Sequence, residues 1–354
     1  MKNSSQSKPI IVLHILKSHS YSGAENVVFT IIKEMNRRYP QKFRMIYVSV
    51  KGTIQELLEE NHISYELIST LSVKYITDII DKYHADVIHA HDFSASVICA
   101  LVPRRIKLVS HLHNNPPWLK RVCVYSLAYG IASIRFQNIL VVSKAILEEY
   151  IFSFLIRKKV KLISNPVCVS RILEQVENEN KKYDIVFVGR LSKQKEPKRF
   201  LEIIAEIKKK RNFLNVVMVG DGELKNEVIE TIKEFKLEEN INLVGFQKNP
   251  YIYMNQSKIL CLTSSYEGYG LVAFEALALG IPAVVSSVGG LKNIVNESCG
   301  KLCQCNREFE EEIMNLLSDE KYYNLKAESA KKRACDLENV NEYMLKLEEI
   351  YGVE

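Results

Sequence analysis

The segment Glu267-Gly-Tyr-Gly-Leu-Val-Ala-Phe-Glu275 combines the residue types best suited to chemistry in this 354-residue sequence. It follows an apolar run at residues 259–263, which predicts a strand, and it leads into a helix. Its glycines let backbone N–H groups approach a ligand, and a helix N-terminus adds free donors and a positive dipole end, which favour a diphosphate. Glu275 would lie about one turn inside that helix, where it could accept hydrogen bonds from ribose hydroxyls. A single carboxylate here could simply cap the helix. Two glutamates, Glu267 and Glu275, around a Gly-x-Gly segment favour a binding site instead.

Two cations, Arg190 and Lys195, follow a second apolar run at residues 183–188. Fixed cations at the end of a strand can neutralise a leaving diphosphate. An isolated Arg and Lys at this spacing are most often surface charges. The functional interpretation of Arg190 and Lys195 therefore depends on the two glutamates in the same half of the chain. We therefore expect Arg190 and Lys195 to act on the same phosphorylated ligand as Glu267.

Histidines follow the apolar strands of the first half. His113 closes the run at residues 108–113, and α/β domains place ligand-facing groups at the carboxyl ends of their strands. His111 points to the same face of an ideal strand, so strand geometry leaves both residues open. His89 and His91 form a similar pair beside Asp92, and we expect these groups to line a loop. A structural histidine with satisfied hydrogen bonds remains the alternative for each.

Strands and helices alternate along both halves of the chain. In the first half, the predicted strands are residues 10–16, 43–50, 87–91, 108–113 and 139–142, with helices at 24–38 and 53–61. In the second half, the predicted strands are residues 183–188, 215–219, 242–244, 259–263 and 283–286, with helices at 197–211, 223–235 and 270–279. Fully apolar strands joined through helices predict parallel sheets covered on both faces. The expected fold class is therefore α/β, with two doubly wound domains.

Composition excludes several classes of protein. With 47% hydrophobic and 25% charged residues, the chain is unlike a disordered, collagen-like or coiled-coil sequence. Eight cysteines in this length are too few for a disulfide scaffold and indicate reduced thiols in the cytoplasm. The apolar run at residues 10–16 is too short for a signal or membrane helix, and no stretch of about 18 apolar residues occurs elsewhere.

The charge of the chain is divided unevenly. Residues 1–171 hold 23 Lys and Arg against 12 Asp and Glu, a net charge of +11, while the rest carries −5. Such asymmetry favours an anionic surface or substrate on the basic side. The segment 117–138, with Trp118, Lys120 and Arg121 before an apolar stretch, could lie on an anionic leaflet, or form a buried helix. Nucleic acid is disfavoured, because no recognition motif occurs and the second half is acidic.

Other motifs are weak or absent. Cys299, Cys303 and Cys305 lack a fourth zinc ligand at the usual spacing, so incidental thiols are the better interpretation. No Gly-x4-Gly-Lys-Ser/Thr segment occurs, which excludes a P-loop. Gly268–Ala273 satisfies a permissive dinucleotide fingerprint, but the next strand, residues 283–286, ends without the acidic residue that holds a ribose, which disfavours a nicotinamide oxidoreductase.

These motifs resemble those of the family 4 retaining glycosyltransferases of GT-B fold, over almost the whole chain. The segments that carry the resemblance are Ser22–Glu25, Asp86–Asp92, Val109–Asn114, Val142–Lys144, Ser164–Val167, Phe187–Lys195, Val219–Glu223 and Glu267–Pro282. Two positions depart from the family pattern. Ser22 replaces the first glycine of the N-terminal loop, and Glu196 stands where glycine usually follows the lysine.

The resemblance implies two Rossmann-like domains facing across a cleft, and a role for each candidate residue. The nucleotide diphosphate sugar, expected to be UDP-linked, would bind the second domain as donor substrate, with no other cofactor and no metal; no Asp-x-Asp motif for a metal occurs. By this resemblance, Glu275 would bind the ribose and Glu267 the hexose. Gly23 would approach the phosphate–sugar junction, and His113 would orient the sugar near its C6 hydroxyl. The residues implied to stabilise the diphosphate are Arg190, Lys195, Gly268, Tyr269, Gly270 and Leu271. The family also implies same-face attack, in which the leaving phosphate helps deprotonate the acceptor.

The expected domains are residues 1–168 for the acceptor, residues 169–337 for the nucleotide sugar, and a C-terminal helix within 338–354 that packs back on the first domain. The expected activity is hexose transfer to a lipid-linked saccharide in cell-surface polysaccharide or glycolipid synthesis. The expected location is cytoplasmic, peripheral on the inner face of the plasma membrane. The alternative is a non-catalytic GT-B-like subunit that binds a nucleotide sugar or partners an active transferase.

Overall fold

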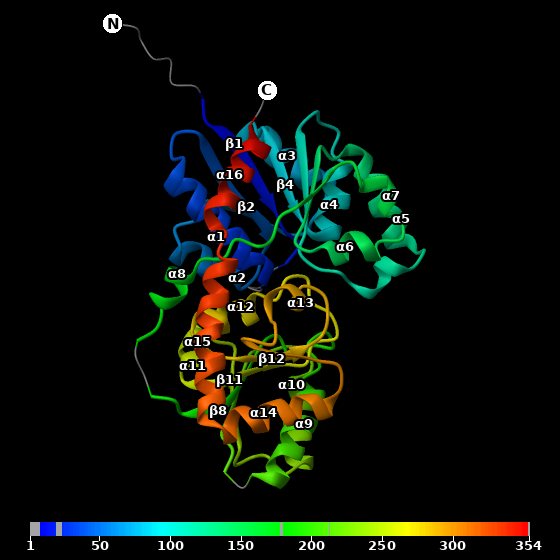
Figure 1. The fold of residues 1–354 in the computed structure, drawn as a ribbon. Helices are drawn as coiled ribbons and strands as arrows, with labels where there is room; N and C mark the ends of the chain where they lie inside the picture. Colours follow the sequence, from blue (N-terminus) through cyan, green and yellow to red (C-terminus); the bar gives the residue numbers. More distant parts are fainter. Residues whose placement is uncertain (1–7, 19–22, 178–179, 212, 353–354) are drawn as a thin grey trace, which may run out of the picture. The chain divides into compact units, whose positions relative to one another are not determined.

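The chain forms two compact units, each built on one parallel sheet (Figure 1). The computed structural model describes residues 8–18, 23–177, 180–211 and 213–352. The first unit comprises residues 1–166 and 339–354, and the second comprises residues 167–338. The boundaries expected after residues 168 and 337 differ from this division by two residues and one residue.

The first unit has a seven-stranded sheet in the order β3-β2-β1-β4-β5-β6-β7, and every neighbouring pair is parallel. Its strands are β1 (Ile10–Ile15), β2 (Phe43–Val50), β3 (Tyr65–Ile68), β4 (Val87–His91), β5 (Lys107–Leu112), β6 (Asn138–Val141) and β7 (Val160–Leu162). The order reverses beside β1, so β1 and β4 form the switch point where α/β sheets place ligands. Every residue of β4 is buried, which explains its continuous apolar and histidine sequence.

The helices of the first unit cover this sheet and end at recognisable signals. They are α1 (Gly23–Arg38), α2 (Ile54–Glu60), α3 (Val73–Tyr83), α4 (Asp92–Ala100), η1 (Pro117–Lys120), α5 (Val124–Ala132), η2 (Ser133–Arg135), α6 (Lys144–Glu149), α7 (Ser153–Ile156) and α16 (Val340–Tyr351). Helix α3 begins where the Ser72 hydroxyl accepts a hydrogen bond from the Tyr75 N–H, and it ends at His84 in the left-handed conformation.

The last helix, α16, belongs to the first unit although it closes the chain. It contacts α1, and Figure 1 draws it in red against the blue N-terminal elements. Its Tyr351 is fully buried, and the hydroxyl group forms a hydrogen bond with His89 Nδ1 (2.6 Å). The apolar face of α16 therefore closes one side of the first sheet.

The second unit has a six-stranded parallel sheet in the order β10-β9-β8-β11-β12-β13. Its strands are β8 (Tyr183–Val188), β9 (Val216–Val219), β10 (Ile241–Gly245), β11 (Ser257–Leu262), β12 (Ala283–Ser286) and β13 (Gly300–Cys303). Its helices are α8 (Val169–Leu173), α9 (Pro197–Lys210), α10 (Lys225–Glu234), α11 (Tyr251–Asn255), α12 (Leu271–Ala278), α13 (Leu291–Ile294), α14 (Asn306–Ser318) and α15 (Glu320–Leu337). The order reverses between β8 and β11, and the loops that follow these two strands contain Lys195 and Glu267.

Three strands were not predicted from the sequence: β3, β7 and β13. Each is an edge strand of its sheet and has only three or four residues. In β7, Lys161 and Leu162 are exposed, so the strand lacks the apolar run on which the prediction depends. These short edge strands extend the two sheets without changing the predicted division into two parallel-sheet domains.

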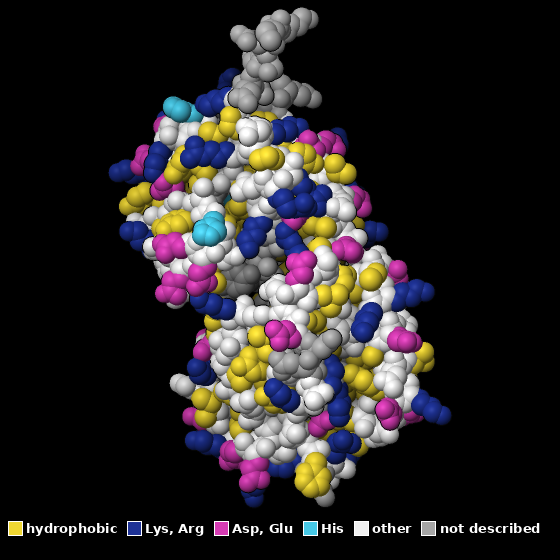
Figure 2. Space-filling view, turned by 90° about the vertical axis from the view of Figure 1, so that its left-hand side faces the viewer, with side chains coloured by type: hydrophobic (Ala, Val, Ile, Leu, Met, Phe, Trp, Pro, Cys, Tyr) yellow, Lys and Arg dark blue, Asp and Glu magenta, His cyan; other side chains and the backbone are white. Residues whose placement is uncertain are grey.

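The surface carries charges of both signs. On the face drawn in Figure 2, Lys and Arg side chains (dark blue) are interspersed with Asp and Glu side chains (magenta) over both units. On this face, charged side chains of both signs are thus spread over each unit. Within the described ranges, no helix has both the length and the hydropathy needed to cross a membrane.

Candidate functional site

An ion pair joins two loops at the switch point of the second unit. The Lys195 ammonium group, in the loop after β8, donates to the Glu267 carboxylate in the loop after β11. Both side chains are largely buried, with 15% and 9% of their surface exposed, and the Ser264 hydroxyl also donates to Glu267 Oε1 (2.8 Å). The pair is therefore held with little freedom, in an environment where electrostatic interactions are stronger than in bulk water.

Hydrogen bonds to the backbone fix these two loops against each other. The Thr263 hydroxyl donates to the carbonyl oxygens of Lys195 (3.1 Å) and Glu196 (3.0 Å). Gln194 Nε2 donates to the Tyr266 carbonyl oxygen (2.9 Å), and the Ser265 N–H donates to the Gln194 carbonyl oxygen (2.8 Å). Thr263 and Gln194 were not identified as contacts between the loops, because a threonine or glutamine beside a strand has no distinctive pattern.

Helix α12 begins directly after this ion pair. Gly270 precedes Leu271 with φ +98°, a conformation that residues with a side chain rarely adopt, and a Cβ there would also meet the Leu291 side chain at 2.6 Å. The first N–H groups of a helix lack the usual intrahelical acceptors and can bind an anion. In α12 the Ala273 N–H already donates to the Gly270 carbonyl oxygen (3.0 Å), so the donors that face an anion are those of Leu271 and Val272. Of the expected diphosphate contacts, Gly268, Tyr269, Gly270 and Leu271 thus form one continuous turn at the helix N-terminus. Burial raises the pKa of the Tyr269 hydroxyl to about 12.

A second glycine pair supports this turn. Gly289 has φ +46°, and a Cβ there would lie 1.8 Å from the Glu267 carbonyl oxygen. The Gly290 N–H donates to that same oxygen (3.0 Å). The loop after β12 can therefore pack on the backbone of Glu267 only because both positions lack a side chain. The sequence signal, Gly289-Gly290 shortly after the strand predicted at residues 283–286, was present but was not used.

Glu275 lies inside α12 with 7% of its surface exposed. Burial raises the pKa of its carboxyl group to about 7, against the opposing effects of the Tyr251 hydrogen bond and the positive charge of Lys195. The Tyr251 hydroxyl donates to Glu275 Oε1 at 3.1 Å. A carboxyl group of this pKa gains or loses its proton near neutral pH, so its capacity to accept hydrogen bonds depends on pH. Tyr251, on α11, was not identified from the sequence.

Arg190 takes a different position from Lys195. Its side chain is 67% exposed and lies 3.3 Å from Glu223, at the end of the neighbouring strand's loop. The structure thus brings together Lys195, Glu267 and the start of α12, while the Arg190 guanidinium group pairs at the surface. Arg190 stays a predicted diphosphate ligand.

Glu196 adopts the left-handed conformation, with φ 47° and ψ 56°, directly before α9. This geometry gives a physical reason for the glycine that the family pattern has here, since glycine alone adopts it without steric cost. The Glu196 carboxylate lies 3.6 Å from Arg199, one turn into α9. The departure from the pattern therefore leaves the backbone turn in place.

In the first unit, His113 follows β5 directly and is 9% exposed. Its backbone N–H donates to Asp92 Oδ1 (3.0 Å), and its ring Nε2 forms a hydrogen bond with His91 Nδ1 (2.9 Å). Burial lowers the pKa of His113 to about 4 and raises the pKa of Asp92 to about 6. Asp92 itself has φ 63°, which places its carboxylate against the end of β5.

The remaining predicted residues also have defined places. His111 is fully buried on β5, as a structural histidine would be. His89 and His91 are buried on β4, so these two lie inside the sheet instead of lining a loop as expected. Gly23 is the first residue of α1, and it is exposed. Ser22, the departure in the N-terminal loop, lies outside the described residues.

Comparison with known proteins agrees with the fold and the motifs. The family model described as Glycosyltransferase Family 4 matches residues 21–171, and the model described as Glycosyl transferases group 1 matches residues 170–333. The chain belongs to the family 4 glycosyltransferases of GT-B fold. Its two parallel-sheet units are the two Rossmann-like domains of that fold.

Two curated relatives illustrate the range of the family. A Campylobacter jejuni protein named N-acetylgalactosamine-N,N'-diacetylbacillosaminyl-diphospho-undecaprenol 4-alpha-N-acetylgalactosaminyltransferase is 30% identical over 66% of this chain and 64% of its own length. An uncharacterized glycosyltransferase of Methanocaldococcus jannaschii is 28% identical over 59% of this chain and 57% of its own. The chain thus spans less than two thirds of the length of these relatives.

Among solved structures, the Anabaena protein HepE in complex with UDP-glucose matches with a TM-score of 0.82. The alignment covers 96% of this chain and 98% of HepE at 21% identity. At this identity the likeness concerns the fold, and it extends over almost the whole of both chains.

Proposed function

We propose that this protein is a retaining glycosyltransferase that moves a hexose from a nucleotide diphosphate sugar, preferably UDP-linked, to a lipid-linked saccharide. The observation that carries the proposal is the Lys195–Glu267 ion pair held at the N-terminus of α12. A cation, a carboxylate and free helix N–H groups in one buried place match the parts of such a donor: a diphosphate and a polyhydroxylated sugar.

In this proposal Lys195 and the turn Gly268–Leu271 stabilise the charge that develops on the departing diphosphate, and Arg190 joins them when the donor binds. Glu267 accepts hydrogen bonds from hexose hydroxyls, and Glu275 accepts them from the ribose. Gly23 approaches the junction of phosphate and sugar, and His113 orients the sugar. The leaving phosphate helps to deprotonate the acceptor hydroxyl, which then attacks from the same face.

The acceptor class is inferred from relatives. The Campylobacter jejuni relative is named for a diphospho-undecaprenol-linked saccharide, and we extend that class of lipid-linked acceptor to this chain. Synthesis of a cell-surface polysaccharide or glycolipid is the corresponding process. The protein then acts at the cytoplasmic face of a membrane.

An exposed apolar surface of the first unit supports this location. It lies on α5, α7 and the residues beside them, and we call it the α5–α7 surface: Val122, Val124, Tyr125, Leu127, Ile131, Ile134, Phe154 and Leu155. Val124 is 79% exposed, and Ile134 is 74% exposed. A cluster of large exposed apolar residues of this kind marks an interaction site.

Cations border the same surface. Lys120, Arg121, Arg157 and Lys158 are all exposed beside it. Lys159 is half-buried, and its ammonium group is already engaged, because it donates to the carbonyl oxygens of Ser133 (2.9 Å) and Ile134 (2.8 Å). We propose that the α5–α7 surface rests on anionic lipid, with apolar side chains at the acyl boundary and cations at the headgroups.

Vesicle binding tests this part of the proposal. Replacing Val124, Ile131 and Ile134 by serine, or Arg121, Arg157 and Lys158 by glutamine, is expected to lower cosedimentation with phosphatidylglycerol-containing vesicles at least tenfold. The expected loss follows because each cation near an anionic membrane contributes about 1 kcal/mol to binding. The matched control replaces Lys208, Lys209 and Lys210 at the end of α9 by glutamine. It should leave binding within about twofold, since these cations lie outside the α5–α7 surface. Equal loss in the control, or salt-insensitive binding by the wild type, would argue against a specific surface.

Transfer itself is tested with purified protein, a panel of nucleotide sugars and a lipid-linked saccharide extract, followed by mass spectrometry. The expected product has gained one hexose, and NMR shows the anomeric configuration of the donor retained. A protein that binds a nucleotide sugar without forming any product would instead be the non-catalytic subunit. An inverted anomeric centre would contradict same-face attack.

A further inference from the structure

Five histidines share one face of the central strands of the first sheet. His14 lies on β1, His89 and His91 lie on β4, and His111 and His113 lie on β5 or directly after it. His14 is the register partner of His89, and His91 is the register partner of His111. Alternate residues of a strand point to the same face. The roles proposed above use only His113, which leaves four buried histidines without an explanation.

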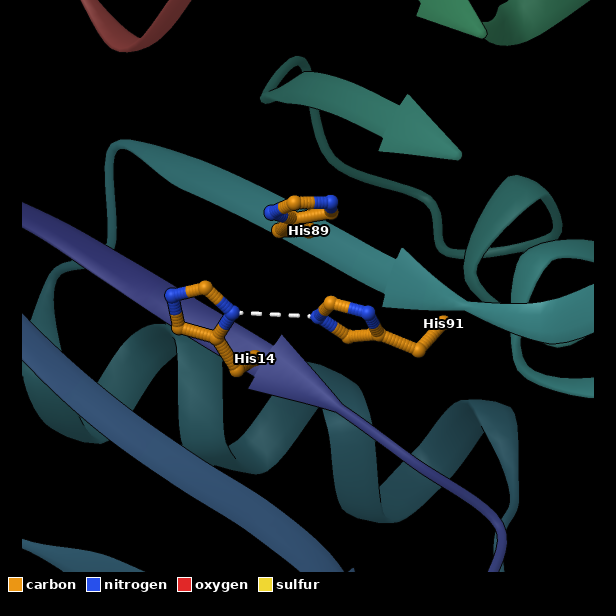
Figure 3. Close-up of side chains that lie close together, drawn as sticks. All are labelled: His14, His89 and His91. Atoms are coloured by element: carbon orange, nitrogen blue, oxygen red, sulfur yellow. Dashed lines mark hydrogen bonds between the residues drawn. The ribbon is translucent and has the colours of Figure 1, made fainter. Parts of the chain in front are cut away.

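Hydrogen bonds divide these histidines into two chains. In the first, His14 Nδ1 bonds to His91 Nε2 (3.0 Å), as Figure 3 shows, and His91 Nδ1 bonds to His113 Nε2 (2.9 Å). In the second, the Tyr351 hydroxyl bonds to His89 Nδ1 (2.6 Å), and His89 Nε2 bonds to His111 Nδ1 (3.2 Å). The first chain ends at the residue expected to contact substrate.

Every ring of the first chain is neutral at physiological pH. Burial lowers the pKa of His14 to about 3 and the pKa of His113 to about 4, and it lowers the pKa of His91 well below its usual value. A neutral imidazole has one N–H and one bare nitrogen. Because each link needs one proton, only two arrangements satisfy both links: all three rings protonated at Nδ1, or all three at Nε2.

The two ends of the chain decide between these arrangements. At the inner end, His14 Nε2 is buried and has no hydrogen-bond partner in the described part of the protein. Protonation at Nε2 would leave a buried N–H group there without an acceptor, and such orphaned donors are rarer in proteins than incompletely paired acceptors.

At the outer end, the Asn165 side chain raises the pKa of His113 against the larger effect of burial, and Nδ1 is the ring nitrogen left for it because Nε2 bonds to His91. Asn165 Oδ1 and His113 Nδ1 are both buried, and neither has a hydrogen-bond partner among the residues that the structure describes. A side chain that raises the pKa of a histidine stabilises a ring proton, so Asn165 favours a proton on Nδ1 over a bare nitrogen there. Both ends therefore favour protonation at Nδ1.

We propose that His14 and His91 are positioning residues that hold His113 in its neutral Nδ1–H tautomer. His91 occupies Nε2 of His113, so the one remaining hydrogen-bonding group of His113 is a donor. That donor fits an oxygen acceptor of the ligand, which is a hydroxyl of the donor sugar if the proposed function holds. In this tautomer His113 binds and orients the sugar, and it has no bare nitrogen with which to take a proton from the acceptor.

A metal ion is the competing explanation for the cluster. His14, His89 and His91, and likewise His91, His111 and His113, have nitrogen atoms within 4.8 Å of one another. However, the rings of His89 and His91 are stacked, with centroids 4.2 Å apart and planes at 27°. Imidazoles that share a metal direct their in-plane lone pairs at one point, which stacked rings do not do. Both nitrogens of His89 and of His91 also have hydrogen-bond partners already.

The test is ¹⁵N NMR of the histidine rings in the full-length protein, with His113 assigned by comparison with His113→Gln. The expected wild-type spectrum has a protonated Nδ1 and a bare Nε2 on His113. A protonated Nε2 on His113 would overturn the proposal. So would stoichiometric binding of Zn²⁺ that removes the ring N–H signals of His14 and His91.

A matched pair of His14 variants tests whether the hydrogen-bond chain sets the tautomer of His113. In His14→Asn the amide nitrogen can take the place of Nδ1 and donate to His91, so His113 keeps its Nδ1 proton. In His14→Asp the carboxylate accepts from His91 Nε2, which reverses both links and moves the proton of His113 to Nε2. An unchanged His113 tautomer in the folded aspartate variant would contradict control by the chain. If neither variant folds, the wild-type spectrum still decides the tautomer.

The activity readout is separate. If the protein transfers sugar as proposed, His14→Asp lowers kcat/KM for the donor at least tenfold, consistent with the loss of one buried hydrogen bond, and His14→Asn loses less. Equal losses in both variants would show a merely structural role for His14. Absence of transfer in the wild type would refute the proposed function and leave the tautomer result standing.

Discussion

Lys195 and Glu267 form a largely buried ion pair between the loops that follow β8 and β11. The two strands are adjacent in the sheet, although 72 residues separate the two side chains in the sequence. Thr263 and Gln194 hold the same two loops together through the backbone. The cation expected to stabilise a leaving diphosphate is thus fixed before the ligand arrives, which is the arrangement that makes electrostatic catalysis effective.

Removing this cation is expected to abolish most of the transfer activity. We expect Lys195→Met to lower kcat by on the order of 10²–10³-fold, the cost of losing one fixed group that stabilises transition-state charge. Lys193→Met is the control, because Lys193 is exposed in the same loop, and its activity should stay within about twofold. Steady-state assays with thermal unfolding of both variants make the comparison, and equal losses in the two would refute the special role of Lys195.

Nucleotide affinity is expected to rise with pH through the titration of Glu275. Its pKa is about 7 in the folded protein without ligand, so below pH 7 the carboxyl group is protonated and is a poorer acceptor for ribose hydroxyls. The dissociation constant for UDP, measured by calorimetry, should fall between pH 6 and pH 8, by at most about tenfold per pH unit for one proton. In Glu275→Gln this pH dependence should disappear, and its persistence would assign the effect to another group.

Stability should fall at acid pH because of the buried histidines. Their pKa values are lower in the folded state than the ordinary value of 6.5, so the unfolded state binds more protons below that pH. The free energy of unfolding should therefore be highest above pH 6.5 and decrease as pH falls toward 4, by up to about 1.4 kcal/mol per pH unit for each such histidine.

Urea unfolding at several pH values measures this slope. His14→Asn should reduce it, because one buried neutral histidine is lost. His84→Asn should leave it unchanged, since His84 is exposed at the end of α3. If the wild type, His14→Asn and His84→Asn lose stability equally per pH unit, carboxyl groups, and not the histidine cluster, control acid unfolding.

Glu196→Gly should stabilise the protein. Glu196 has φ 47°, and a residue with a side chain in this left-handed conformation costs roughly 1 kcal/mol. The half-buried ion pair with Arg199 is long, at 3.6 Å, and contributes little in return. We expect the free energy of unfolding in urea to rise by about 0.5–1 kcal/mol. A decrease would mean that the Glu196 side chain contributes more than its backbone costs.

Sequence patterns predicted the fold closely where strands are long and apolar. The bounds of β2, β4, β8 and β12 agree with the predicted ranges, because buried parallel strands are continuous apolar runs. The edge strands β3, β7 and β13 were missed, since pairing with one neighbour leaves short, partly polar segments that no local pattern distinguishes from loops.

The candidate site could be predicted only in part. Residues in recognisable motifs, such as Glu267 and Lys195, were identified, but their mutual contact depends on which strands are neighbours. Tyr251 reaches Glu275 from another helix, and nothing in its local sequence indicates this. The histidines on β4 were expected to line a loop, whereas the structure buries them, because α16 returns from the C-terminus and places Tyr351 against His89.

The central claim is that the chain transfers a hexose from a nucleotide sugar to a lipid-linked saccharide. The most direct measurement is mass spectrometry of the lipid acceptor after incubation with UDP-hexoses, for the wild type, Lys195→Met and Lys193→Met. The account predicts a product one hexose heavier, together with released UDP, for the wild type and Lys193→Met, and at most a trace for Lys195→Met. Binding of the nucleotide sugar without any glycosylated lipid, or equal product from all three proteins, would contradict it.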